Sequence, residues 1–152
     1  MSVQPQKRWT SEEYLAFERS QDERHELING EIVMMSGASR THNIIVANTV
    51  TTLTNQLEKR PCEIYPSDMR VRVNARNYFY PDVVVVCGDP ILEDASVDTL
   101  LNPTVIFEVL SPSTKKFDRK SKFAGYRQIS SLREYLMISQ DEPRLEHFTL
   151  ME

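Results

Sequence analysis

The chain has 152 residues, 40% of them hydrophobic, which is enough for one ordinary domain with a sizeable core. Its 18 lysine and arginine residues are outnumbered by 22 aspartate and glutamate residues, and the formal net charge of −4 excludes a uniformly basic, histone-like coat for nucleic acid. The longest strongly apolar run, Val83 to Cys87, is too short to span a bilayer, and the polar start lacks the apolar segment of a secretory signal. We therefore expect a cytoplasmic protein that does not enter a membrane.

The two cysteines, Cys62 and Cys87, lie far apart in the sequence and form no Cys-x-x-Cys pair. This pattern supports neither a disulfide scaffold nor a thiolate zinc site, because both use several cysteines at characteristic spacings. We expect two reduced thiols.

The first predicted elements are a helix and a hairpin. Residues 10–13, Thr-Ser-Glu-Glu, form a capping box, so we expect a short helix that ends at about residue 19. Within residues 25–34, two short segments flank Asn29-Gly30, the dipeptide that most readily takes the positive φ angles of a two-residue turn. This segment therefore predicts a β-hairpin.

A longer helix is predicted over residues 41–59, ended by Pro61. Four apolar residues recur in it at spacings of four, three and four, which places them on one helical face. These residues are Val46, Val50, Leu53 and Leu57.

Two strands are predicted next, over residues 63–73 and 78–86, around a turn at residues 74–77. The second becomes continuously apolar, as expected for a strand in the middle of a sheet. Residues 89–102 show no sustained periodicity, and residues 104–110 form another nearly continuous apolar strand.

The last part of the chain predicts an amphipathic helix over residues 118–129 and strands over residues 134–139 and 144–150. In this order the elements predict a mixed α/β sheet with helices against its faces. We expect a single domain over residues 1–152.

Two acids, Asp82 and Glu108, lie within the two most apolar strands, although a carboxylate is costly to remove from water unless its charge is compensated. A divalent cation would compensate both, since carboxylate oxygens are the ligands that Mg²⁺ and Mn²⁺ prefer. Alternatively, Asp82 is solvated at a strand end, and Glu108 pairs with an arginine such as Arg70 or Arg72.

A basic segment follows the strand that contains Glu108. Residues 111–127 hold six basic residues and one acid, a local charge of +5 in an acidic chain. The basic residues are Lys115, Lys116, Arg119, Lys120, Lys122 and Arg127, and the acid is Asp118. Two interpretations are open: a surface that binds a nucleic-acid backbone, or a solvated helix face.

Several short motifs, in this order, resemble the PD-(D/E)XK nuclease superfamily, and more narrowly the Uma-two family of proposed restriction endonucleases (domain of unknown function 820). They are Tyr80-Pro81-Asp82, Glu108-Val109, then Asp118 and Lys122 before Tyr126, together with residues 25–31, His42 and residues 111–114. The resemblance covers about residues 10–144. It implies an α/β fold with a restriction-endonuclease-like core of helix, three strands, helix and strand, here with an N-terminal helix and β-hairpin extension.

The resemblance also implies site roles. Asp82 and Glu108 would hold Mg²⁺ or Mn²⁺, with the Val109 carbonyl as a further ligand. The lysine that usually stands two residues after the second acid is replaced here by Leu110. Lys122 matches where this family carries a lysine and would replace it. Lys120 is the competing choice, although it would point to a different side of the helix.

Three further candidates are weighed against structural roles. His42 could carry a proton or orient a carboxylate, or it could simply cap or pack the long helix. Glu26 could supply a third carboxylate or a hydrogen bond to a ligand or to His42, although without the resemblance it reads as an exposed hairpin acid. Tyr126 is expected to pack against Phe123.

The predicted function is a metal-dependent endonuclease that hydrolyses phosphodiester bonds in DNA. Lys115, Lys116, Arg119 and Lys120 would contact the DNA backbone, and a homodimer would present two sites to a duplex. The alternative is a catalytically inactive nuclease-fold module that binds nucleic acid or a protein partner, which Leu110 and the acidic charge favour. A third possibility is a structural subunit that dimerises through an apolar edge strand. Members of the resembled family usually continue past the last predicted strand, so a C-terminal segment could be missing.

Overall fold

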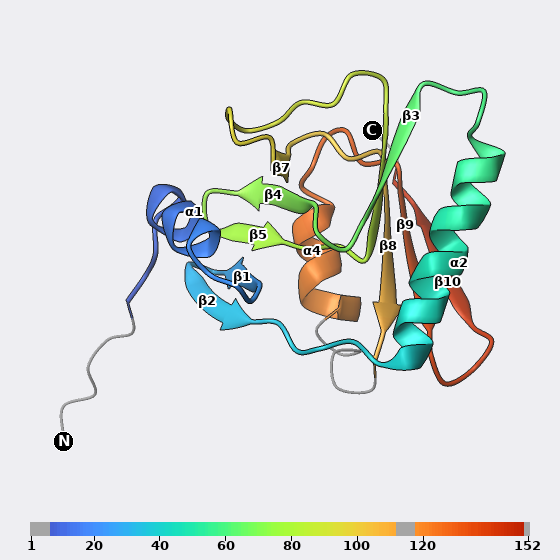
Figure 1. Cartoon of the computed structure of the whole chain (residues 1–152), viewed down its shortest axis with the longest axis horizontal. Helices are drawn as coiled ribbons and strands as arrows, with labels where there is room; N and C mark the ends of the chain where they lie inside the picture. Colours follow the sequence, from blue (N-terminus) through green and yellow to red (C-terminus); the bar gives the residue numbers. More distant parts are fainter. Residues whose placement is uncertain (1–6, 112–117, 151–152) are drawn as a thin grey trace.

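The computed structural model of the chain describes residues 7–111 and 118–150, with the side chains of Asp118 and Arg119 left out of the description. Figure 1 shows two sheets side by side, with α1 beyond the first sheet, α4 beside the second, and α2 along the outer face of the second. The elements in chain order are α1 (Ser11–Arg19), β1 (His25–Ile28), β2 (Glu31–Met34), α2 (Arg40–Gln56), β3 (Cys62–Pro66), β4 (Arg70–Asn74), β5 (Asn77–Phe79), β6 (Val83–Cys87), β7 (Thr99–Leu100), β8 (Val105–Leu110), the π-helical turn η1 (Asp118–Lys122), α4 (Phe123–Tyr126), β9 (Glu134–Ser139) and β10 (Leu145–Thr149). The predicted α/β class is confirmed.

The first sheet has the strand order β2-β1-β5-β4-β7 and is assembled from hairpins. Asn29 and Gly30 have φ angles of 51° and 80°, so the predicted turn between β1 and β2 is confirmed. The capping box is confirmed too, because the Thr10 hydroxyl accepts from the Glu13 amide at 3.2 Å. Tyr14 of α1 then packs against the sheet.

The second sheet has the order β10-β9-β8-β6-β3, with β8 parallel to β9 and antiparallel to β6. Its strands β6 and β8 are mostly buried and apolar, because both faces of the sheet are covered there. One face packs in a core cluster with α4 and the first sheet. The other face packs against α2 through the predicted residues Val46, Val50, Leu53 and Leu57. The strand β6 lies between β3 and β8, as predicted for a strand within the sheet.

Each of the two strands predicted for residues 63–73 and 78–86 is in fact two strands in different sheets. The second one is interrupted at Pro81, which has no amide hydrogen for a sheet and therefore favours an interruption. The two-residue strand β7 was not predicted; it pairs with β4 alone and bridges to Leu92. The predicted helix over residues 118–129 is shorter, since its first turn is a π-helix and α4 ends at Tyr126.

The prediction of two reduced thiols is wrong in this structure. Cys62 and Cys87 are directly opposite each other on the antiparallel strands β3 and β6, with their Cα atoms 4.0 Å apart, and they form a disulfide. The sequence distance between them hid this pairing because strand register is a non-local property. In the described part of the chain no helix has the length and apolar character needed to cross a membrane.

Candidate active site

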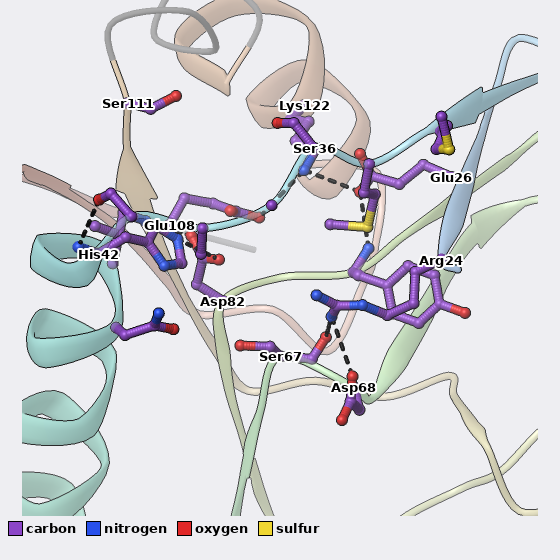
Figure 2. Close-up of a pocket in the computed structure, with 18 of the residues that line it drawn as sticks. Arg24, Glu26, Ser36, His42, Ser67, Asp68, Asp82, Glu108, Ser111 and Lys122 are labelled. Carbon is purple, nitrogen blue, oxygen red and sulfur yellow. Dashed lines mark hydrogen bonds and ion pairs between the residues drawn. The ribbon is translucent and has the colours of Figure 1, made fainter. Parts of the chain in front are cut away.

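A pocket of about 690 Å³ opens where β6 begins, β8 ends and α2 begins (Figure 2). The hairpin strands β1 and β2, the loop after β3 and the π-helical turn η1 complete its walls. Within the described residues, its charged lining consists of Arg24, Lys122, Glu26, Asp68, Asp82 and Glu108. With His42 neutral, two cations face four carboxylates, which leaves a net charge of −2.

Asp82 lies at this pocket because Pro81 ends the sheet pairing immediately before it. Val83 pairs with Phe107, so the register continued by one residue places Asp82 opposite Glu108 on the neighbouring strand. The Asp82 carboxylate is held on both oxygens: Oδ1 lies 2.9 Å from Nε2 of His42, and Oδ2 accepts from the Val109 amide at 2.7 Å. The two acids predicted from the sequence therefore meet at one point.

Glu108 is buried in the middle strand of the sheet, and its charge is compensated by groups from η1 and α4. Its Oε1 accepts from the Tyr126 hydroxyl at 3.1 Å, and the Lys122 ammonium lies 3.8 Å away. Burial, with the nearby Glu108 charge, raises the pKa of Tyr126 well above its usual value, so the hydroxyl remains protonated and can donate. Pairing with Arg70 or Arg72, the alternative from the sequence, is not observed, because Arg70 contacts Asp98 and Arg72 lies near Glu93.

Lys122 reaches the pocket from the last residue of η1. Its ammonium is 2.9 Å from Oε2 of Glu26, and the same carboxylate oxygen accepts from the Tyr80 amide at 2.8 Å. Glu26 is thus a buried partner of Lys122 and not an exposed hairpin acid. Lys120, the competing choice, is exposed and is not among the lining residues. A π-helical turn is common at functional sites, where it redirects side chains away from their α-helical positions.

His42 lies in the first turn of α2, where the Ser39 hydroxyl caps the helix by accepting from the His42 amide at 3.1 Å. The imidazole is turned toward Asp82, as described above, and lines the pocket. The structure therefore places His42 where it can orient a carboxylate. Its role in proton transfer stays a prediction.

The predicted basic surface is only partly described. Lys115 and Lys116 lie outside the described residues, and the side chain of Arg119 is also outside the description. Lys120 is exposed to solvent. Contact of these residues with a nucleic-acid backbone remains a prediction.

Sequence reasoning missed two contributions to the pocket. Tyr126 packs against Phe79 and Tyr135, as an aromatic core residue would, but its hydroxyl also holds Glu108. The spacing of four residues from Lys122 was an available signal, because i and i+4 side chains share a helical face. Arg24 was not singled out, since a lone arginine before a hairpin strand carries no such pattern.

The carboxylates of the pocket fit a divalent ion such as Mg²⁺. Among the described residues, no group of three or more His, Cys, Asp and Glu side chains is arranged as a metal cage. Mg²⁺ needs fewer protein ligands, since it is usually held by one or two carboxylates with water and substrate phosphate. Asp82 and Glu108 provide these carboxylates. The Val109 carbonyl lies on the same side of its strand as the amide that donates to Asp82. The excess negative charge of the lining also fits a cation.

Comparisons with known proteins identify relatives of this chain by sequence and by fold. The protein of unknown function sll1609 from Synechocystis sp. is 42% identical over 149 residues, covering 97% of this chain and 84% of that protein. A second Synechocystis protein of unknown function, slr1290, is 39% identical over 136 residues, covering 89% of this chain and 70% of its own length. The fold is similar to the crystal structure of "a putative nuclease belonging to DUF820" from Anabaena variabilis, with a TM-score of 0.77 at 17% identity, over 94% of this chain and 80% of that one. Residues 11–152 match the model of the family Uma2, described as "Putative restriction endonuclease", and the chain belongs to that family.

Proposed function

We propose that the protein is a metal-dependent endonuclease that hydrolyses phosphodiester bonds in DNA. The observation that carries this proposal is the meeting of Asp82 and Glu108 on neighbouring strands, at an open pocket, with the buried ammonium of Lys122 beside Glu108. Two hard carboxylates and a lysine at one point are the groups that phosphodiester hydrolysis uses. Family membership and the nuclease-like fold support the same reaction class.

Each residue has a role in this proposal. Asp82, Glu108 and the Val109 carbonyl would hold Mg²⁺ or Mn²⁺. Bound there, the ion would stabilise negative charge on the phosphate and lower the pKa of a water molecule. Lys122 would donate a hydrogen bond to a phosphate oxygen as negative charge develops on that oxygen in the transition state. Alternatively, it would orient the attacking water.

The remaining side chains position these groups. His42 fixes one oxygen of Asp82, and Tyr126 fixes one oxygen of Glu108. Glu26 restrains Lys122 at 2.9 Å. The described residues form one such site, so double-strand cutting would be easiest for a homodimer with twofold symmetry, which presents two sites to a duplex.

The test is cleavage of supercoiled plasmid and of single-stranded DNA with Mg²⁺, with Mn²⁺ and with a chelator. The wild-type protein should cut with either metal ion and not with the chelator. Asp82→Ala and Glu108→Ala should each abolish cutting while keeping the far-UV circular dichroism spectrum of the wild type. Asp141→Ala, at an exposed aspartate outside the pocket lining, is the matched control. Continued cutting by a purified Asp82→Ala, Glu108→Ala double variant would refute the mechanism.

A module that binds nucleic acid without cutting it is the second candidate. Two observations favour it: Leu110 occupies the position of the usual lysine, and the acids at the pocket already have protein partners. Such a module would bind DNA without turnover in both metal ions. Binding would be lost in Lys122→Ala and retained in Asp82→Ala, whereas the nuclease loses cutting in both.

A further inference from the structure

The pocket has a second end that the proposed chemistry does not use. Figure 2 shows His42, Asp82 and Glu108 on one side, and Arg24 with Ser67 and Asp68 on the other. Both groups line the same cavity. The second end therefore contacts any ligand large enough to fill the pocket.

Arg24 has the geometry of a phosphate-binding residue at that end. Its Nη1 donates to the Ser67 carbonyl and lies 3.2 Å from Oδ1 of Asp68. The Asp68 side chain is 90% exposed and that of Arg24 37% exposed, so this ion pair is screened by water and weak. Within the described part of the chain, both contacts use Nη1, which leaves Nε and Nη2 for a ligand.

The guanidinium is also held in place from one side. Its Cζ lies 5.6 Å from the ring centroid of Tyr80, and that ring is buried with its hydroxyl hydrogen-bonded to Glu18. A cation over the face of a fixed ring is attracted to it, which restrains the Arg24 guanidinium beside the pocket. The planar edge of that guanidinium matches two oxygens of one phosphate.

An apolar wall lies directly beside Arg24. Val33, at the end of the edge strand β2, is 44% exposed although it lines the pocket. It pairs with Glu26, so its side chain lies on the same face of the hairpin as that pocket carboxylate. Met35, two residues along the chain from Val33, also lines the pocket, and it donates its amide to the Arg24 carbonyl at 2.9 Å, which joins the wall to the arginine. Apolar side chains beside a phosphate-binding group suit the face of a nucleobase.

The depth of the pocket limits the form of the nucleic acid. The side chains of Asp82 and Glu108 are only 14% and 3% exposed, so a phosphate must enter the cavity to reach them. The cavity has the size of a small-molecule site, about 300–1,000 Å³. Duplex DNA is instead recognised over strongly basic surfaces of about 1,000–2,500 Å². A cavity of about 690 Å³ therefore admits one strand and not a duplex.

We propose that the pocket binds an unpaired DNA strand, with the scissile phosphate at Asp82 and Glu108, a neighbouring phosphate on Arg24, and a base against Val33 and Met35. This proposal rests on the proposed function and names its substrate class. Single strands, flaps and frayed ends share the unpaired nucleotide that the pocket requires.

The test measures binding by fluorescence anisotropy, with Ca²⁺ in place of Mg²⁺ because Ca²⁺ also takes carboxylate oxygens. The probes are a labelled single-stranded oligonucleotide and the duplex of the same sequence. The single strand should bind at least about tenfold more tightly. Arg24→Gln should weaken single-strand binding about tenfold and reduce the slope of log K against log salt by about 0.7, the value for one lost phosphate contact. Arg76→Gln removes an exposed arginine outside the pocket and should change neither quantity.

Two further variants keep the test decisive if Arg24→Gln does not fold. Arg24→Lys retains the charge and loses the planar fork, so it should bind the single strand more weakly than the wild type. Met35→Ala should weaken binding without changing the salt slope, since it removes only apolar contact. Equal affinity for duplex and single strand, or equal behaviour of Arg24→Gln and Arg76→Gln, would overturn the proposal.

Cleavage assays with the same oligonucleotides separate this inference from the proposed function. If the wild-type protein cuts neither form but keeps the preference for single strands and its dependence on Arg24, the binding inference stands and the nuclease proposal fails. If it cuts duplex and single strand at equal kcat/KM, and Arg24→Gln cuts as the wild type does, the inference fails and the nuclease proposal stands.

Discussion

Two networks of buried charges lie close together in this molecule, and only one of them faces the pocket. The pocket network consists of Glu26, Lys122, Glu108 and Tyr126, and the inner network of Glu18, His25, Tyr80, Arg70 and Asp98. They meet at Tyr80, whose amide belongs to the first and whose hydroxyl belongs to the second.

The inner network joins two acids, Glu18 and Asp98, to the Arg70 guanidinium and the Tyr80 hydroxyl through short contacts. Glu18 accepts from the His25 amide at 2.9 Å and from the Tyr80 hydroxyl at 3.0 Å. Arg70 donates to Tyr80 at 2.8 Å and lies 2.9 Å from Asp98. These contacts join α1, β1, β4 and the segment before β7, so the network ties the first sheet together.

The pocket network has more acids than bases. One ammonium, that of Lys122, lies between Glu26 and Glu108, and Asp82 is adjacent with a histidine as its partner. A buried acid therefore does not by itself mark a functional site, since both networks contain one. The distinguishing feature is the pocket, which opens to solvent and where Asp82 adds a third acid beside Glu26 and Glu108.

Of the variants that test this difference between the networks, Lys122→Met should have the largest effect on cleavage and on stability. Losing the ammonium should lower the cleavage rate about 10³-fold, as for removal of a charge-stabilising donor. It also leaves Glu26 and Glu108 without their cation, which should reduce the free energy of unfolding by about 3–5 kcal/mol. Both quantities can be measured, by oligonucleotide cleavage and by urea unfolding.

The double variant Glu26→Gln, Lys122→Met separates the two effects. Neutralising Glu26 should restore part of the stability, because one unpaired charge is removed. Cleavage should stay low. Recovery of cleavage in the double variant would show that Lys122 acts only by neutralising Glu26.

Arg70→Met tests the inner network and should mainly affect stability. Breaking its buried contacts should cost about 3–5 kcal/mol of unfolding free energy. The cleavage rate of the folded fraction should fall by less than about tenfold, because Arg70 is not among the residues that line the pocket. Arg72→Met, two residues along β4, is the matched control: its side chain is partly exposed and 3.6 Å from Glu93, and its loss should cost under about 1 kcal/mol.

Glu26→Gln and Glu18→Gln form a matched pair, one buried glutamate from each network. Glu26→Gln should lower cleavage about 10- to 100-fold, the usual cost of losing a residue that orients a catalytic group. The amide can still accept from Tyr80, so the fold should be retained. Glu18→Gln should lower the unfolding midpoint in urea and leave cleavage much less affected. Equal loss of cleavage in both variants would contradict the distinction between the networks.

Local sequence signals predicted much of the fold, because their physical causes are local. The cap at Thr10 and the turn at Asn29-Gly30 are decided by a few neighbouring atoms, and both predictions are confirmed. The assignment of β3 and β4, and of β5 and β6, to different sheets depends on strand partners that lie far away in the sequence. The pairing of Cys62 with Cys87 does so too, and no local pattern predicts such partners. These features were therefore missed.

The residues of the candidate site also differ in how far the sequence could predict them. Asp82 and Glu108 were found because a carboxylate in an apolar strand conflicts with its surroundings, which is visible in the sequence. Lys122 was separated from Lys120 by the family resemblance and by helix geometry, and the structure places Lys122 alone of the two in the pocket lining. Arg24 reaches the pocket through a loop, which carries no periodic pattern, so only the structure identifies it.

The smallest expected effect concerns the pH dependence of the inner network. A hydrogen bond from the Arg19 side chain, opposed by burial, lowers the pKa of Asp98 to about 2. A carboxyl group with a lowered pKa in the folded state contributes stability above its unfolded pKa of about 4, and this contribution is lost as the pH falls toward 2. Asp98→Asn should therefore cost about 1 kcal/mol at pH 6, and the difference from the wild type should vanish near pH 2. Urea unfolding at pH 6, 4 and 2.5 measures this, with Asp141→Asn at an exposed loop position as the control. A difference that is constant over this pH range would show that Asp98 is not ionised in the network, and the ion pair of Arg70 with Asp98 would then be wrong.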